Sequence, residues 1–252
     1  MNTHRQLGVA NNAGAKSMEK LSSGYRINRA GDDAAGLSIS EKMRSQIRGL
    51  TQASRNAQDG ISLIQTAEGA LTETHAMLQR MRELVVQAAS DTNTSDDRTR
   101  ISDELNQLSE EITAITEKTE FNTKKLLDGS FSTDNITLQV GANSAQFIEF
   151  KIGDMSASTL GVTSTAIGTV ISTSTNGAAS ISALLDTVDS ALNAVSAQRS
   201  ALGAVQNRLE HTIKNVDNTS ENLQAAESRI RDVDMAKEMM EFTRQNILQQ
   251  AS

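Results

Sequence analysis

The sequence predicts a mainly α-helical chain: an elongated antiparallel coiled-coil rod with a small β-hairpin and a helix at each terminus. Three observations support this fold class. Apolar residues recur every seven positions in one ladder from each half of the chain, which is the period of helices packed along a supercoiled seam. One stretch between the ladders alternates as a hairpin does. Aromatic residues make up only 2%, and proline and tryptophan are absent, so few large side chains are available for a thick core.

The composition excludes several classes of protein. Cysteine is absent, which removes disulfides, thiol catalysis and zinc–thiolate sites. The formal net charge of −7 argues against a nucleic-acid partner, because such proteins usually carry a basic face. The apolar runs are too short to cross a membrane. The first residues, "MNTHRQLGVANNAG", lack the apolar core of a secretory signal.

Catalytic, cofactor and metal sites are not expected either. The histidines His4, His75 and His211 are widely separated in the sequence. His75 takes the place of an apolar residue in the second seam position of the first ladder, which favours a helix surface or a helix–helix contact over metal ligation. The HExxH zinc motif and a glycine-rich phosphate loop are both absent.

Residues 1–36 form an N-terminal segment. A modest amphipathic helix is expected over about residues 3–21. The stretch "LSSGYRINRAGDDAAGLS" then breaks the helix, because Gly24 and Gly31 punctuate it and Asp32 or Asp33 can cap the next helix. The apolar face of this first helix is thin, so we expect it to need partners.

Residues 37–155 hold a long helix, a shorter helix over about residues 97–118, and the hairpin. The seam of the long helix consists of apolar residues of the heptad series: Met43, Leu50, Ile64, Leu71, Leu78 and Val85. Gly49, Gly60 and Gly69 lie inside this helix. They predict close backbone approach between helices, with a tolerance to bending as the alternative.

One part of the long helix, "LQRMRELVVQ" at residues 78–87, presents a second side. Arg80, Leu84 and Gln87 fall away from the seam at 100° per residue. A seam alone does not require an apolar Leu84 beside a charged Arg80, so this side is predicted to be an exposed contact surface. Ordinary solvated helix surface is the alternative, because single exposed leucines are common.

A hairpin and a polar segment follow. The stretch "NITLQVGANSAQFIEFKI" has two alternating parts around "GANSAQ", which predicts a hairpin with a loop longer than two residues. Residues 156–180 are rich in Ser, Thr, Gly and Ala. We expect them to form an exposed variable insert, mostly loop with weak strand.

The C-terminal half carries the second ladder and a terminal helix. The long helix of residues 181–228 is predicted to run antiparallel to the first, and its seam contains Val188, Val195, Leu202, Leu209, Val216 and Leu223. Its second seam position mixes apolar and polar residues, as expected for a partner that changes along its length. Residues 229–252 continue as a helix expected to lie beside the N-terminal one.

Long motifs along the chain carry a family resemblance. They are "KLSSGYRINRAGDDAAGLSISEKMRSQIRGL", "NAQDGISLIQTAEGALTETHAMLQRMRELVVQ", "TEFNTKKLLDGS", "AVQNRLEHTIKNVDN" and "AAESRIRDVDMAKEM". These motifs are similar to the terminal regions of bacterial flagellin, over nearly all of residues 2–252 apart from 156–180. Compared with the family pattern the insert is short, and both termini are expected to be slightly truncated.

The resemblance implies a function and its partners. It implies a structural subunit, exported by the flagellar type III apparatus, that polymerises with copies of itself into the extracellular filament used for motility. It also implies export and capping proteins of the flagellum as the other bacterial partners. The terminal helices, residues 1–36 and 229–252, would line the filament core, and the long helices would form its outer wall.

The resemblance also implies a receptor contact. The released monomer of many family members is bound by host Toll-like receptor 5. The contact residues carried over are Arg80, Leu84 and Glu104, and Gln87 shares their side of the helix. Arg80 would supply a forked donor, Leu84 an apolar anchor and Glu104 an acceptor. A hook–filament junction protein of the same fold is the alternative, and an enzyme is not supported by any constellation of residues.

Overall fold

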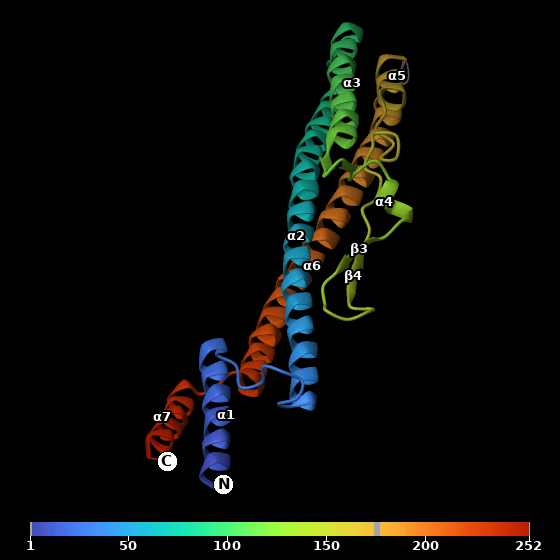
Figure 1. Ribbon diagram of the computed structural model, residues 1–252. Coiled ribbons are helices and arrows are strands. Elements are labelled where there is room, and N and C mark those ends of the chain that lie inside the picture. The colour runs from blue at the N-terminus through green and yellow to red at the C-terminus, as the bar shows by residue number, and fades with distance from the viewer. Residues whose placement is uncertain (1, 174–176, 252) are drawn as a thin grey trace. The chain divides into compact units, whose positions relative to one another are not determined.

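The structure is a computed structural model that describes residues 2–173 and 177–251. Its helices and strands follow one another in this order: α1 (Asn2–Ser23), α2 (Ala34–Ala88), α3 (Ser95–Lys118), β1 (Glu120–Phe121), β2 (Lys124–Lys125), α4 (Ser130–Thr133), β3 (Ile136–Gln139), β4 (Phe147–Phe150), α5 (Ser164–Thr173), α6 (Gly177–Arg231) and α7 (Met235–Ala251) (Figure 1). The predicted mainly helical class with a small antiparallel hairpin is confirmed. Within the described residues, no helix combines the length and the apolar character needed to cross a bilayer.

The chain divides into two compact units. The first consists of residues 1–54, 141–145 and 214–252, and the second of residues 55–140 and 146–213. Both long helices contribute to each unit, since α2 and α6 each contain 55 residues.

The second unit is built on the parts of α2 and α6 that belong to it. Arg82 Nε donates to Asp189 Oδ1 at 2.7 Å, and the Arg199 guanidinium lies 4.0 Å from Glu68. The two helices are therefore antiparallel, because the pairing position falls along α6 as it rises along α2. The seam residues of this unit are all buried, at 1% exposure or less: Ile64, Leu71, Leu78, Val85, Val188, Val195, Leu202 and Leu209.

Helix α3 packs beside α5 in the same unit (Figure 1). Ile101, Leu105 and Ile112 bury one face of α3 in the common core. A reciprocal capping box starts the helix: Thr94 accepts from the Asp97 amide, and Asp97 accepts from the Thr94 amide. This arrangement satisfies two amides that the first turn leaves without helical partners.

The hairpin of β3 and β4 is confirmed, with Ile136 opposite Phe150 and Gln139 opposite Phe147. It lies against α2, where the Asn56 side chain donates to the Gln139 carbonyl oxygen at 3.1 Å. Gly60 makes room for it, because a Cβ there would overlap a Leu138 methyl group. The close approach predicted at this glycine is therefore to the hairpin, not to another helix.

The expectation of an exposed loop with weak strand over residues 156–180 is wrong for the described part up to residue 173. Ala157, Leu160 and Val162 are buried before α5, as are Ile167 and Ile171 within it. Gly161, at φ +72°, turns the chain, and Thr163 caps the helix by accepting from the Ala166 amide. The segment is rich in small polar residues, yet these five apolar side chains are buried. Residues 174–176 lie outside the described residues.

The first unit joins both ends of the chain. Helices α1 and α7 lie side by side (Figure 1), and small residues of α1, Gly14 and Ser17, are buried. The long-helix seam continues here with Leu50 and Val216 buried, whereas Met43 and Leu223 are only half-buried. The Arg44 guanidinium lies 3.6 Å from Glu227, which continues the antiparallel pairing of α2 and α6.

Candidate protein-interaction surfaces

A charged cluster on the second unit joins α2 to α3. Arg80 Nη2 lies 2.9 Å and its Nε 3.0 Å from the Glu104 carboxylate, so the guanidinium donates twice to one partner. Its Nη1 donates to Glu83 at 3.1 Å. The hydrogen bond from Glu104, and after it that from Glu83, raises the pKa of Arg80, which remains charged. The side chains of Arg80, Glu83 and Glu104 are about half exposed or more. Gln87, one turn after Glu83 on α2, is exposed as well.

Leu84 does not belong to this exposed surface. The prediction of an exposed apolar anchor is wrong, because only 2% of Leu84 is accessible and it belongs to the hydrophobic core together with Ile101 and Leu105 of α3. Helix α2 has two packing partners in this region, α6 along the seam and α3 beside it. The second side of α2 seen in the sequence therefore combines Leu84, in a core shared with α3, with Arg80 and Gln87, which reach solvent.

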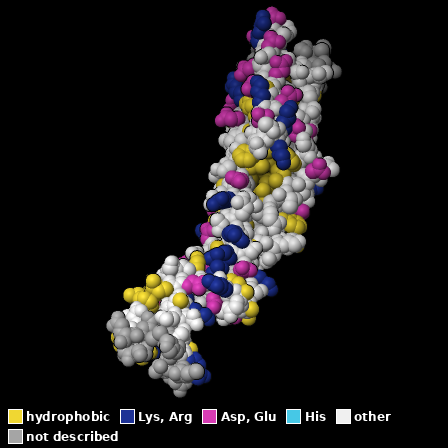
Figure 2. Space-filling view, viewed as in Figure 1, with side chains coloured by type: hydrophobic (Ala, Val, Ile, Leu, Met, Phe, Trp, Pro, Cys, Tyr) yellow, Lys and Arg dark blue, Asp and Glu magenta, His cyan; other side chains and the backbone are white. Residues whose placement is uncertain are grey.

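The terminal helices of the first unit present an exposed apolar surface. On α7 the exposed large apolar side chains are Met235, Met239, Met240, Ile247 and Leu248. A shallow hollow on this helix is lined by Met239, Met240, Thr243, Arg244, Ile247 and Leu248. Figure 2 shows apolar side chains on the described surface of this region, at the lower left. We call the five exposed α7 side chains the α7 apolar face.

Helix α1 contributes to the same kind of surface. Val9 and Met18 are exposed, whereas the small Gly14 and Ser17 are buried. Lys20 of α1 and Glu238 of α7 approach to 3.9 Å and join the two helices. Small and charged groups therefore contribute to the contact between the two helices, and five large apolar side chains of α7 stay exposed.

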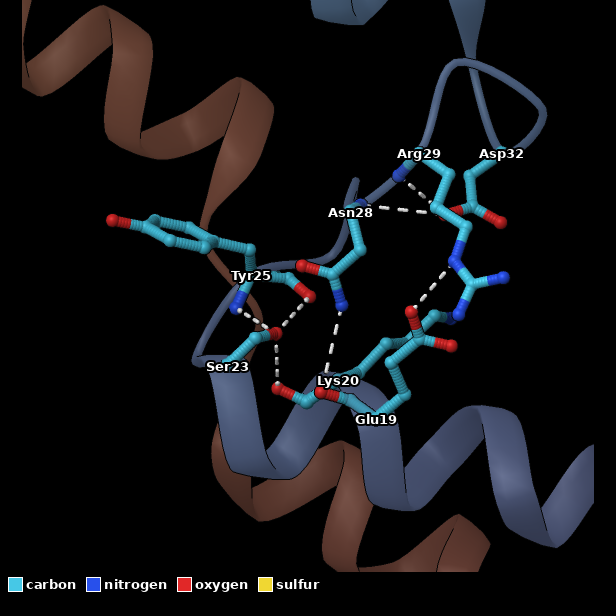
Figure 3. Close-up of polar contacts among 7 residues, drawn as sticks. All are labelled: Glu19, Lys20, Ser23, Tyr25, Asn28, Arg29 and Asp32. Carbon is cyan, nitrogen blue, oxygen red and sulfur yellow. Dashed lines mark hydrogen bonds and ion pairs between the residues drawn. The ribbon is translucent and has the colours of Figure 1, made fainter.

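The α1–α2 connection is held by a dense set of polar contacts (Figure 3). Ser23 Oγ accepts from the Tyr25 amide at 3.2 Å and donates to the Lys20 carbonyl oxygen at 3.2 Å. Further along, the amides of Asn28 and Arg29 both donate to Asp32, at 3.3 and 3.1 Å. These two bonds lower the pKa of the Asp32 carboxyl, with the bond from Arg29 as the largest cause.

Tyr25 ties this connection to the one between α6 and α7. It forms a bridge with Asp232, in which the Arg26 amide donates to the Arg231 carbonyl oxygen (2.7 Å) and the Val233 amide to Gly24 (3.0 Å). The Arg231 guanidinium also lies 4.8 Å from the centroid of the tyrosine ring. The sequence pattern predicts only a helix break in this region and not its contact with the connection before α7. The one available signal was that the only tyrosine of the chain stands inside it.

Among the residues that the structure describes, no group of three His, Asp or Glu side chains could hold a metal ion. His75 Nε2 lies 3.1 Å from the Gln79 side-chain nitrogen on the next turn of α2.

Two family models match the chain. The bacterial flagellin N-terminal helical region matches residues 1–132, and the bacterial flagellin C-terminal helical region matches residues 185–252. The chain is 63% identical over 253 residues to a flagellin of Halalkalibacterium halodurans, an alignment that covers 100% of this chain and 90% of that protein.

Solved structures agree in fold. The crystal structure of Bacillus cereus flagellin is 30% identical, with a TM-score of 0.54, and the match covers 69% of this chain and 94% of that one. A putative flagellar hook-associated protein from Vibrio parahaemolyticus has a TM-score of 0.67 over 80% of this chain and 100% of that one. Its identity is only 14%, so it supports the fold alone. The chain belongs to the bacterial flagellin family, whose members are structural subunits of the extracellular flagellar filament and not enzymes.

Proposed function

We propose that this chain polymerises through the α7 apolar face together with the exposed Val9 and Met18 of α1. The observation that supports this is the difference in burial between the seam of the long helices and the terminal helices. Seam side chains of the second unit are almost fully buried, whereas five large apolar groups of α7 are about half exposed or more. Apolar groups left uncovered in this number mark a surface for another protein. In a homopolymer that protein is a further copy of the chain.

Assembly at a helix face needs little affinity in each contact. Each copy in a helical lattice meets several neighbours, so weak contacts add up along the filament. Export by the flagellar type III apparatus and contacts with capping proteins belong to the same proposal and rest on family membership. The alternative, a hook–filament junction protein, has fold similarity in its favour, whereas the 63% identity favours a filament subunit.

Seeded growth tests the proposed assembly surface. Purified chain is added to short filament fragments, and growth is followed by sedimentation and electron microscopy. Replacing Ile247 and Leu248 together by Gln should abolish growth, whereas replacing both by Met should retain it. The reason is that only the Gln variant loses apolar contact area. Equal growth of the Gln and Met variants would reject the α7 apolar face as an assembly surface.

A second function concerns the released monomer. We propose that Toll-like receptor 5 binds it at the charged cluster of Arg80 and Glu104 together with Gln87. Supporting this proposal, the Arg80 guanidinium is held in a fixed direction by Glu83 and Glu104, yet about half of its side chain is accessible. An oriented, partly exposed arginine is typical of the residues that dominate binding energies.

Binding of the monomer to the receptor ectodomain tests this second proposal. Arg80→Ala should weaken affinity by about tenfold or more, the size of a lost interface arginine. Arg82→Ala is the matched control, since Arg82 is equally exposed on α2 and its partner Asp189 is on α6. Comparable losses for the two variants would mean that the receptor responds to net charge, and the assignment to Arg80 would fail.

A further inference from the structure

The chain distributes its methionines unequally between surface and core. Met235, Met239 and Met240 of α7 are 48%, 50% and 64% exposed. Met81 and Met155, by contrast, are buried in the core of the second unit at 0% and 7%. The thioether sulfurs of α7 are therefore open to small solutes, and those of Met81 and Met155 are not.

Two of the exposed methionines stand where a polar group would do most harm. Met239 and Met240 line the hollow on α7 one helical turn before Thr243 and Arg244 and two turns before Ile247 and Leu248. Spacings of four and eight residues place these side chains along one side of the helix. The hollow is thus formed by flexible, polarisable side chains that can adapt to an apolar partner.

From this arrangement we propose that Met239 and Met240 form an oxidation site that switches the α7 apolar face between assembly-competent and incompetent forms. The co-reactant is a peroxide. A sulfur lone pair attacks one oxygen of hydrogen peroxide, the O–O bond breaks, and an S–O bond forms. After proton transfer the products are methionine sulfoxide and water, so sulfur is oxidised by two electrons and peroxide is reduced by two.

The consequence follows from the chemistry of the sulfoxide. Oxidation changes a flexible apolar side chain into a polar one, which disrupts methionine-rich interfaces. A sulfoxide oxygen buried without a hydrogen-bond donor opposes association. The switch is reversible, because methionine sulfoxide reductases restore the thioether. The inference rests on the proposed assembly surface and adds a modification chemistry to it.

The first experiment measures where peroxide acts. The unassembled full chain is treated with hydrogen peroxide, and peptides that gain one oxygen atom are followed by mass spectrometry over time. Met239 and Met240 should be oxidised at least about tenfold faster than the buried Met81 and Met155, which serve as internal references. Equal rates at the four positions would overturn the proposal.

The second experiment measures assembly. Seeded growth is measured for peroxide-treated and for untreated chain, and the ratio of treated to untreated growth is calculated. This ratio is compared between the natural sequence and the double variant Met239→Leu, Met240→Leu. Leucine has a similar volume and cannot be oxidised. The ratio should fall by about tenfold or more for the natural sequence and recover after reductase treatment. It should fall much less for the variant, in which Met18 and Met235 are the exposed methionines that can still be oxidised.

Two outcomes separate the failure of this inference from the failure of the assembly proposal. If oxidation occurs at Met239 and Met240 and the natural sequence still grows as untreated chain does, the switch is rejected. If, in addition, the Gln variant of Ile247 and Leu248 grows normally, the assembly surface itself is rejected. Loss of growth in treated natural chain and treated double variant alike would reject Met239 and Met240 as the site.

Discussion

At the scale of single residues, Leu84 shows how one helix can have more than one buried side. The residue lies off the seam, at a position that a two-helix pairing would leave in solvent. Leu84 is 2% exposed and lies in the same core as Ile101 and Leu105 of α3. Its neighbour Arg80 remains accessible because its partner is the carboxylate of Glu104 at the edge of that contact.

Leu84→Ala should therefore destabilise the fold by about 2–5 kcal/mol, the usual range for a buried leucine replaced by alanine. Urea unfolding followed by circular dichroism measures this difference. Val86→Ala is the matched control on the same helix, because Val86 is 50% exposed, and it should change stability by no more than about 0.5 kcal/mol. Similar values for the two variants would contradict the burial of Leu84.

At the scale of the element, the capping box at the start of α3 contributes stability that depends on pH. The Thr94 hydroxyl donates to the Asp97 carboxylate at 2.7 Å and the Thr94 amide at 3.0 Å. The hydroxyl, as the larger cause, and the amide lower the pKa of Asp97 below its ordinary value of 3.8. The Asp97 carboxylate therefore stabilises the fold at pH values above its pKa in the unfolded chain. This stabilisation is lost as the pH falls through its lower pKa in the folded chain.

Asp97→Asn should lower the melting temperature at pH 7, and the difference from the natural chain should shrink as pH falls below about 4. Thermal unfolding across this pH range measures both effects. Asp96→Asn, a change of one charge in the same first turn, controls for the interaction with the helix dipole. A loss from Asp97→Asn that is constant with pH would show that the carboxylate charge does not stabilise the cap.

Two glycines of α2 also belong to this scale, and replacing each by alanine should change stability in opposite directions. A methyl group at Gly60 would overlap Leu138 of the hairpin, whereas one at Gly69 would meet open space. Gly69→Ala should stabilise the chain by up to about 1 kcal/mol through helix propensity. Gly60→Ala should destabilise it, because the hairpin must move away. Thermal unfolding of both variants checks the signs, and two gains would contradict the contact at Gly60.

At the scale of the whole molecule, the bridge at Tyr25 and Asp232 links two segments that the sequence separates by about two hundred residues. It holds the connection after α1 against the connection before α7 by two backbone hydrogen bonds. The connections that lead to α1 and to α7 are therefore joined to each other at this bridge. The tyrosine ring, with Arg231 at 4.8 Å and Arg44 at 5.9 Å from its centroid, covers this point.

Tyr25→Ala should accelerate hydrogen exchange at the Arg26 and Val233 amides by about tenfold, the equivalent of losing a partly desolvated cation–π contact. Tyr25→Phe keeps the ring and should stay close to the natural chain. The Thr119 amide, which donates to Ile115 in the second unit, provides an internal reference. Unchanged exchange at Arg26 and Val233 in the Ala variant would show that the ring does not protect the bridge.

By itself the sequence determined the periodic features of this protein. Heptad spacing located both long helices and their seam from Leu50 to Val85 and from Val188 to Val216, and alternation located the hairpin of β3 and β4. Such patterns arise because each helix or strand must turn one repeating face away from water, a requirement that neighbouring residues express locally.

Only the tertiary structure decided which further surfaces are covered. Leu84 lies in a core that also contains residues of α3, and Gly60 lies against the hairpin. Ala157, Leu160, Val162, Ile167 and Ile171 are buried in a turn and helix of polar composition. Tyr25 meets Asp232 because two chain connections converge. Each of these contacts joins residues far apart in the chain, and the period of one element contains no information about how many partners will surround it.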